Sequence, residues 1–320
     1  MGYFVQDNWK VTPRLSLNLG VRYDYEKLPA PYSALTTLPQ TANHPSDKNN
    51  IAPRVGFAWD PFGLGKTVVR GGFGFYYGRV FNAYLLNTYY QTGASNSQVS
   101  YTYTPTTALN GVSIAPTFPN LAAVPPPPAA QGPNIYYFDK NFQNPNAEQF
   151  DLAIQQDLGR QTVLSVSYIG ALGRQLPNYL NVHLNPANTY TFNYAVGAAA
   201  NGSCGPLACG TTVPVKVYSN KTQTGATSST YKFNTPFPAY NSVTDVISNI
   251  NSNYHALTFE IQRRASKLLS YDAHYTWAHA LDFNQTIGTT PSGNNWFDPL
   301  ANARSNYGNS GNDIRQRFVG

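Results

Sequence analysis

Residues 15–25 read LSLNLGVRYDY and alternate apolar with polar or small side chains at every position. One set of alternate positions is wholly apolar and ends in two aromatic residues: Leu15, Leu17, Leu19, Val21, Tyr23 and Tyr25. The other set, from Ser16 to Asp24, is polar or small. Successive side chains of a β-strand point to opposite faces, whereas a helix would scatter these residues around its circumference. The stretch therefore predicts an amphipathic strand, and its length suits a strand that crosses a tilted barrel wall.

The same period of two recurs along the chain, in pairs of segments that are joined by turns of four to six residues. Together with the first segment it predicts about nine long antiparallel strands. They lie near residues 3–10, 15–25, 52–60, 67–79, 147–157, 162–170, 254–264, 269–279 and 313–320.

Long polar segments separate these hairpins, at residues 26–51, 80–146, 171–253 and 280–312. They are rich in Gly, Pro, Asn, Ser and Thr, and they all fall at the same end of the predicted strands. Short turns at one end and long loops at the other are typical of outer-membrane barrels, whose short turns are periplasmic. We therefore expect an all-β fold, in which residues 1–320 form a partial outer-membrane β-barrel domain with long extracellular loops.

A soluble β-sandwich also alternates apolar and polar residues, and it is the main competing fold. Two features favour the membrane barrel. The predicted strands run to as many as 13 residues, against a usual five to six. Aromatic residues also recur near the strand ends, where they would form girdles at the two membrane interfaces. These residues are Tyr3, Trp9, Tyr23, Tyr25, Trp59, Tyr76, Tyr77, Tyr168, Tyr275 and Trp277.

The composition excludes several other classes of protein. Of the 320 residues, 42% are hydrophobic and 14% aromatic, but only 11% are charged, against roughly 25% in a typical soluble domain. Such a composition argues against coiled coils, helical solenoids and most doubly wound α/β enzymes. The net charge of +6 is dispersed, with Arg263 and Arg264 as the one adjacent basic pair, so we expect no nucleic-acid partner. The sequence has no apolar run long enough for a membrane helix, and its first residues do not read as a signal peptide.

Several stretches resemble one known family. Residues 3–24, YFVQDNWKVTPRLSLNLGVRYD, look like a barrel hairpin of TonB-dependent outer-membrane transporters. Four others resemble the Oar-like subgroup: APRVGFAW at 52–59, VRGGFGFYYG at 69–78, YTWAHALD at 275–282 and DIRQRFV at 313–319. The resemblance implies a receptor or transporter in the cell outer membrane that moves an unidentified substrate.

The resemblance also implies partners. Members of the family have more strands than the nine predicted here, and an N-terminal plug, so we expect this chain to be a barrel fragment without plug or TonB box. As a fragment it would expose unpaired edges at 3–10 and 313–320, so the isolated chain should not form a stable monomeric barrel. The implied partners are outer-membrane lipid, an unknown ligand at the extracellular loops, and the TonB energy-coupling complex, which would act through the absent N-terminal part.

No group of residues has the spacing of a catalytic, cofactor-binding or metal site. GKT at 65–67 resembles the end of a P-loop, but Asp60 stands where that motif needs Gly and a strand follows it. His274 and His279 fall on opposite faces of a predicted strand and cannot share a metal ion there. The sequence offers no nucleophile elbow and no close pair of carboxylates for acid–base catalysis. We expect neither enzyme activity nor a cofactor.

Six charged residues of the predicted strands would face the barrel interior: Arg22, Asp24, Arg54, Arg70, Asp151 and Glu260. Charged groups are tolerated there because they are wetted or paired, whereas facing lipid would be costly. Two interpretations of these six residues remain open. They could form ion pairs with one another along the wall, or they could contact a plug or a substrate.

The two cysteines, Cys204 and Cys209, lie in a long loop with four residues between them, flanked by Gly202 and Gly210. The glycines allow the backbone to turn tightly enough for the two side chains to meet. The loop is predicted to be extracellular, where no reducing agents of the cell keep thiols in the reduced state. We therefore predict a disulfide between them.

Two classes of function follow from these observations. The resemblance favours the barrel portion of a TonB-dependent, Oar-like transporter. The alternation of residues alone also fits a β-protein without transport activity, either an adhesin-like outer-membrane barrel or a soluble β-sandwich module that binds glycans.

Overall fold

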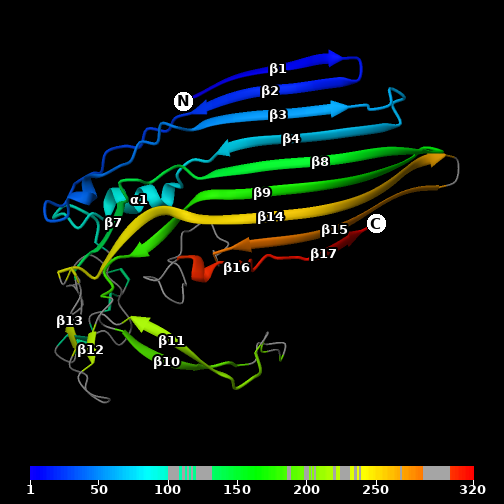
Figure 1. Ribbon diagram of the computed structural model, residues 1–320. Coiled ribbons are helices and arrows are strands. Elements are labelled where there is room, and N and C mark those ends of the chain that lie inside the picture. Colours follow the sequence, from blue (N-terminus) through cyan, green and yellow to red (C-terminus); the bar gives the residue numbers. More distant parts are fainter. Residues whose placement is uncertain are drawn as a thin grey trace.

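One curved β-sheet of eleven strands dominates the computed structural model (Figure 1). The structure describes residues 1–99, 108–109, 112–113, 115–116, 118–119, 132–185, 189–197, 202, 204, 207–218, 221–223, 231–233, 236–237, 239–266, 269–283 and 303–320. Among these residues, no helix combines the length and the apolar character that crossing a membrane requires.

The main sheet follows the order of the chain. Its successive antiparallel neighbours are β1 (Gly2–Thr12), β2 (Leu15–Asp24), β3 (Ile51–Trp59), β4 (Thr67–Tyr77), β8 (Asn146–Gly159), β9 (Thr162–Asn181), β14 (Ser242–Ser266) and β15 (Leu269–Asp282). Two short strands, β16 (Gly308–Asn309) and β17 (Gln316–Val319), both pair with β15. Short hairpin turns gather at one end of the sheet and the long connections at the other (Figure 1). The predicted antiparallel barrel segment is confirmed.

The remaining strands form three small ribbons. They are β5 (Ala108–Leu109) with β6 (Val112–Ser113), β10 (Thr189–Ala195) with β11 (Thr212–Tyr218), and β12 (Lys221–Gln223) with β13 (Tyr231–Phe233). A sandwich needs a second large sheet packed face to face on the first. In the described parts of the chain no such sheet exists, so the competing β-sandwich interpretation is wrong.

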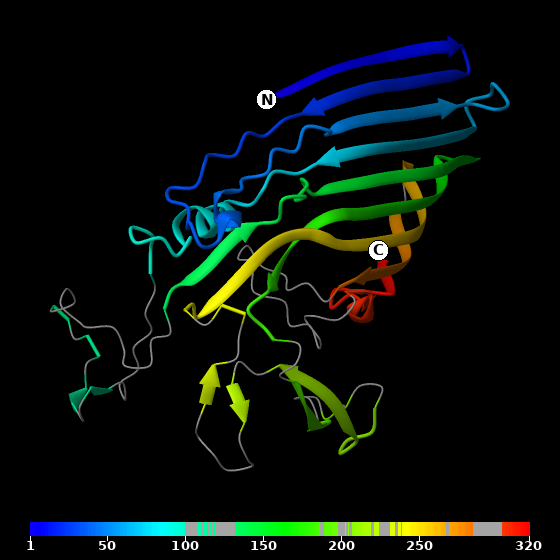
Figure 2. The same cartoon turned by 60° about the vertical axis from the view of Figure 1, so that its left-hand side comes forward.

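The cross-strand register sorts the side chains of the main sheet into two faces. On one of them Asn18 lies opposite Gly56, which lies opposite Gly72, and this row continues through Asp151 to Ile169. Directly opposed residues of an antiparallel pair point to the same side. Cavities of about 520 Å³ and about 240 Å³ hollow this side. It is the concave face of the sheet, which curls between the blue β1 and the orange β15 (Figure 2).

The convex face is mainly apolar, although the register also places Asp7, His255 and His279 on it, in the row of Leu19. The row on the other side of that of Asn18 contains Leu17, Phe57, Gly71, Leu152 and Tyr168. Large apolar side chains of this face have no protein cover, as Trp277 with 58% of its surface exposed illustrates. An apolar surface that extends over so many strands is stable when lipid covers it.

Tyr76 is a correction to the predicted aromatic girdles. The register places it on the concave face, together with Gly74 and Arg54. The Arg54 guanidinium carbon lies 4.4 Å from the centre of the Tyr76 ring. Tyr76 therefore makes a cation–π contact inside the barrel wall, and the adjacent Tyr77 takes the convex side.

Two strands run far beyond their predicted ends. β9 continues past residue 170 to Asn181, and β14 begins at Ser242, twelve residues before its expected start. The alternation disappears in these extensions because neither face meets lipid there. Shifts of register between Ile247 and Ser252 interrupt it further. A parallel strand, β7 (Asn134–Phe138), pairs with the β14 extension.

The outer cap covers these extensions. It consists of residues 25–50, 78–99 and 132–145, which include η1 (Pro39–Ala42), α1 (Asn82–Tyr90) and β7. Its core consists of fully or nearly fully buried apolar residues from the cap and from both extensions: Leu38, Val80, Tyr84, Ile135, Phe138, Phe142, Tyr179, Val243 and Val246. The segments predicted as polar loops at 26–51 and 80–146 thus contain folded, packed structure. The last helix, η2 (Ala303–Asn306), precedes β16.

The β10–β11 ribbon carries the two cysteines in the connection between its strands. Cys204 and Cys209 form a disulfide in the structure, with Cα atoms 5.3 Å apart. Gly202 and Gly210 both have positive φ angles, 78° and 83°, which favour glycine. The disulfide of the native protein in its own compartment stays a prediction.

Candidate functional site

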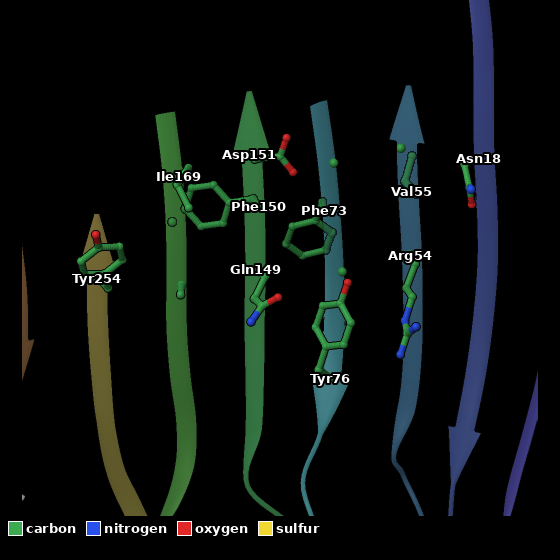
Figure 3. A pocket seen from close by; sticks show the side chains of 15 residues that line it. Asn18, Arg54, Val55, Phe73, Tyr76, Gln149, Phe150, Asp151, Ile169 and Tyr254 are labelled. Carbon is green, nitrogen blue, oxygen red and sulfur yellow. The ribbon is translucent and has the colours of Figure 1, made fainter. Parts of the chain in front are cut away.

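The larger cavity lies on the concave face, over the middle strands of the sheet. Glycines at positions 56, 72 and 74 of β3 and β4 are among the residues that line it, beside the side chains that Figure 3 labels. A Cβ atom at Gly72 would lie 3.0 Å from a carboxylate oxygen of Asp151, so side chains could be added there only by displacing that group. Arg54 and Tyr76 lie in the same way over Gly74, so two of these glycines make room for side chains of the wall itself.

Arg54 is the cation at this cavity, and it stacks on Tyr76. The Arg54 Nε atom is buried, and among the described residues it has no hydrogen-bond partner. A buried donor without an acceptor is costly, and a guanidinium suits the planar oxygens of carboxylates and amides. Gln149 and Asp151 add an amide and a carboxylate to the same lining (Figure 3). The cavity therefore offers hydrogen-bond donors and acceptors, together with a positive and a negative charge, to a polar ligand.

The smaller cavity adjoins the first three strands and shares Arg54 with the larger one. Arg22 and Asp24 form a two-pronged ion pair beside it, with Nε to Oδ2 at 2.7 Å and Nη2 to Oδ1 at 2.8 Å. The amide of Gln6 donates a hydrogen bond of 3.1 Å to Asn18 Oδ1. The charges of Arg22 and Asp24 are thus directed to each other along one strand, while Arg54 remains available.

The six charged residues predicted to face the interior all lie on the concave face by register, but they do not form one site. Arg22 pairs with Asp24, and Arg54 shares a cavity with Asp151. Arg70 lies between two alanines, and Glu260 lies opposite His274. The role of these residues in contacting a substrate or a plug stays a prediction.

In the described part of the chain, one group of three side chains has the spacing of a metal-ligand set. Ligand atoms of Glu260, Asp272 and His274 all lie within 4.8 Å of one another on the concave face. The cross-strand register places Glu260 opposite His274. The positions of the histidines in the sequence do not reveal this pairing. His274 Nε2 lies 2.9 Å from Asp272 Oδ1. This contact gives both groups a partner without a metal ion.

Buried ionisable groups that sequence patterns did not single out lie in the outer cap and in the segments that it covers. Burial and the nearby Asp139 raise the pKa of Asp245 to about 7, although a hydrogen bond from Tyr137 works against them. Burial also lowers the pKa of His44 and of His183. These residues lie in segments without periodicity, so the sequence offered no signal that they are buried. The stability of the cap should therefore depend on pH.

Comparisons with known proteins agree with this architecture. The family model described as "Outer membrane beta barrel domain" matches residues 1–320. The TonB-dependent transporter Oar of Myxococcus xanthus is 38% identical over 80 residues, which make up 25% of this chain and 7% of that protein. This chain thus spans a small part of that relative's length.

Among solved structures, the outer membrane transporter YddB from Escherichia coli is similar with a TM-score of 0.45 and 11% identity, over 89% of this chain and 24% of that one. The FrpB iron transporter from Neisseria meningitidis has a TM-score of 0.42 and 9% identity, over 88% and 25%. In both structures, the part similar to this chain is about a quarter of the whole.

Proposed function

The chain belongs to the outer membrane β-barrel domain family, and on this premise we propose that it forms part of the barrel of a TonB-dependent, Oar-like receptor or transporter. It lies in the cell outer membrane. The observation that carries the proposal is the division of one sheet into a polar, hollowed concave face and a mainly apolar convex face. Adjacent residues such as Leu17 and Asn18 belong to opposite faces. The chain would act in transport and not as an enzyme, in keeping with the transporters that it resembles.

In this proposal the concave wall lines the path of the substrate. Arg54, Gln149 and Asp151 would offer hydrogen bonds to a substrate or to a plug that fills the barrel. Charges of both signs keep the path polar and wet. A transported solute would thus pass through weak, exchangeable polar contacts instead of one tight site.

The outer cap would capture the ligand on the extracellular side. Its buried core supports this role, because a packed cap can present a fixed surface where a free loop cannot. The energy for release would come from the TonB complex, acting through parts of the full-length protein outside this barrel segment. The wall itself would stay rigid during transport.

Energy-dependent access to the wall separates a transporter from an adhesin-like barrel. The full-length protein would carry Gln149→Cys in a background with Cys204→Ser and Cys209→Ser, and cells would be treated with a membrane-impermeant maleimide. We expect faster labelling at position 149 in cells with a working TonB complex than in cells without it, because energised opening uncovers the cavity.

Lys140→Cys on the exposed surface of the outer cap is the control, since it should label equally in both strains. Equal labelling at position 149 in both strains would contradict transport and would favour the adhesin-like barrel.

A further inference from the structure

The short-turn end of the sheet carries a continuous rim, which we call the turn rim and which comprises residues 13–14, 60–66, 157–161 and 263–264. Backbone hydrogen bonds join each turn to the next. The amide of Asp60 donates to Arg14 O at 2.8 Å, that of Asp157 to Lys66 O at 2.7 Å, and that of Arg264 to Gln161 O at 3.1 Å. These turns lie together at one end of the sheet (Figure 1). The rim is therefore one surface and not four separate turns.

Basic residues outnumber acidic ones on this surface. The turn rim contains two acids, Asp60 and Asp157, and five basic residues: Arg14, Lys66, Arg160, Arg263 and Arg264. Both acids accept hydrogen bonds from turn backbone. Asp60 accepts from the amides of Gly63 and Gly65, and Asp157 from that of Gly159, each at 2.8 Å. The carboxylates thus shape the turns, while four of the five basic residues, Arg14, Lys66, Arg160 and Arg264, are exposed.

Apolar side chains are interleaved with these cations. Phe62, Leu64 and Leu158 have 65%, 72% and 56% of their surfaces exposed, and each lies within a few residues of Lys66 or Arg160. An acidic soluble protein would be an alternative partner for this surface, but binding it would not require exposed apolar side chains at the ends of the turns. A membrane interface suits both types of group, since apolar tips enter the acyl region while long cationic side chains extend to the phosphates.

The β8–β9 turn holds its cation in an unfavourable conformation. Arg160 and Gln161 have φ angles of 52° and 64°, in the left-handed region where tight hairpins usually place Asn or Gly. Asn or Gly at position 160 would fit this backbone better than Arg does. The presence of a long cation at the tip is consistent with a role for its charge.

We propose that the turn rim binds the phosphate groups of anionic phospholipids in the periplasmic leaflet of the outer membrane. Guanidinium groups pair with phosphate in a two-pronged geometry, and several cations at a membrane surface add their attractions. The flanking Phe62 and Leu64 would fix the depth of the turns in the bilayer. This interaction requires only an inserted barrel, so it does not depend on the proposed transport activity.

Native mass spectrometry of the full-length protein in neutral detergent tests this proposal, with phosphatidylglycerol and phosphatidylcholine as probes. We expect a preference for phosphatidylglycerol in the unchanged protein. Combining Arg14→Gln, Lys66→Gln and Arg160→Asn should weaken phosphatidylglycerol binding on the order of a hundredfold, since each cation near a membrane surface contributes about fivefold. Binding of phosphatidylcholine should change little. Arg160→Asn alone suits the turn, so it should fold and still lose about fivefold.

A matched control removes three exposed lysines from the outer cap through Lys27→Gln, Lys48→Gln and Lys140→Gln, with the same change in net charge. It should leave lipid binding unchanged, and an equal loss would overturn the proposal. A second pair, Phe62→Ser with Leu64→Ser, should weaken binding without any change of charge. Displacement of the lipid by inorganic phosphate at constant ionic strength, together with no effect of the Phe62 and Leu64 changes, would show a site for soluble anions and refute the lipid assignment.

Discussion

The membrane wall and the outer cap share strands β9 and β14, yet they bury apolar side chains in opposite ways. In the wall half of β14, Leu257 and Phe259 point outward without protein cover, and Phe259 has 42% of its surface exposed. In the cap half of the same strand, Val243 and Val246 are completely buried by the surrounding cap segments. One continuous strand therefore passes from a lipid environment into a protein core.

This difference shows that the surroundings, and not the strand itself, determine which residues are stable at each position. In lipid, alternate apolar residues suffice, because the bilayer provides the apolar contact. Beyond the membrane the same side chains meet water, so other segments of the chain must cover them. Loss of a cap residue should therefore leave the wall intact, and loss of a wall residue should leave the cap intact.

The largest effect is expected from Phe138→Ala in the cap core. Phe138 is fully buried and packs on Phe142, with ring centres 4.9 Å apart, so its removal should cost the cap about 3–5 kcal/mol. Hydrogen exchange should show faster exchange in α1 and β7, while the wall strands stay protected. Phe81→Ala, at an exposed cap position, is the control. Equal loss of protection in wall and cap would contradict the separation of the two regions.

Charge placed on the lipid face should have the next largest effect. Leu17→Arg or Phe259→Arg should destabilise the inserted full-length barrel by about 2–4 kcal/mol, the cost of Arg near the middle of a bilayer. Asn18→Arg and Thr258→Arg change adjacent positions that face the lumen, so they should be much milder. Urea unfolding in lipid vesicles measures the difference. Similar losses at both members of each pair would show that the two faces are assigned wrongly.

The disulfide should contribute less, and only locally. Closing the small ring between Cys204 and Cys209 should constrain the unfolded chain by about 2 kcal/mol. Protein prepared from its native membrane, alkylated without reduction and analysed by mass spectrometry should show neither cysteine alkylated. Two alkylated cysteines would refute the bond. After reduction, heat resistance of the wall should be unchanged.

The smallest effect concerns the pH dependence of the cap. The pKa of Asp245 is about 7 in the folded protein and 3.8 in its ordinary state, so the folded cap holds a proton that the unfolded chain has lost. Stability should therefore fall as pH rises between these two values, and the last part of the fall, between about pH 6 and about pH 8, should amount to about 1 kcal/mol. Hydrogen exchange of β7, corrected for intrinsic rates, measures this change. Asp245→Asn should abolish it, and an unchanged slope in that variant would exclude Asp245 as the source.

The wall could be predicted from sequence because lipid imposes a strict period of two on each strand, as residues 15–25 show. The extensions of β9 and β14 could not, since polar residues such as those at 248–249 and 251–253 remove the alternation where lipid is absent. The helix α1 was missed for a related reason. It is a short run rich in Tyr and Asn, and no side chain caps its start at Phe81.

The concave site was predictable in part. Alternation alone assigned Arg54 and Asp151 to the interior, because each occupies a polar position of its strand. It could not show that Arg22 and Asp24 neutralise each other, since a strand places residues two apart on one face without fixing their rotamers. Tyr76 was assigned to a girdle because its residue type suggested an interface, although its position in the alternation placed it inside. In this wall, position in the strand was a better guide than residue type.

Spin labels placed one at a time at residues 256–261 of the full-length protein in lipid vesicles test the two-faced wall most directly. Collision rates with oxygen, which dissolves in lipid, and with a water-soluble nickel complex should alternate with a period of two. Labels at positions 257, 259 and 261 should favour oxygen, and those at 258 and 260 should favour nickel, because the register places these sets on opposite faces. Rates without alternation, or with the opposite phase, would contradict the assignment of the convex face to lipid and the concave face to the lumen.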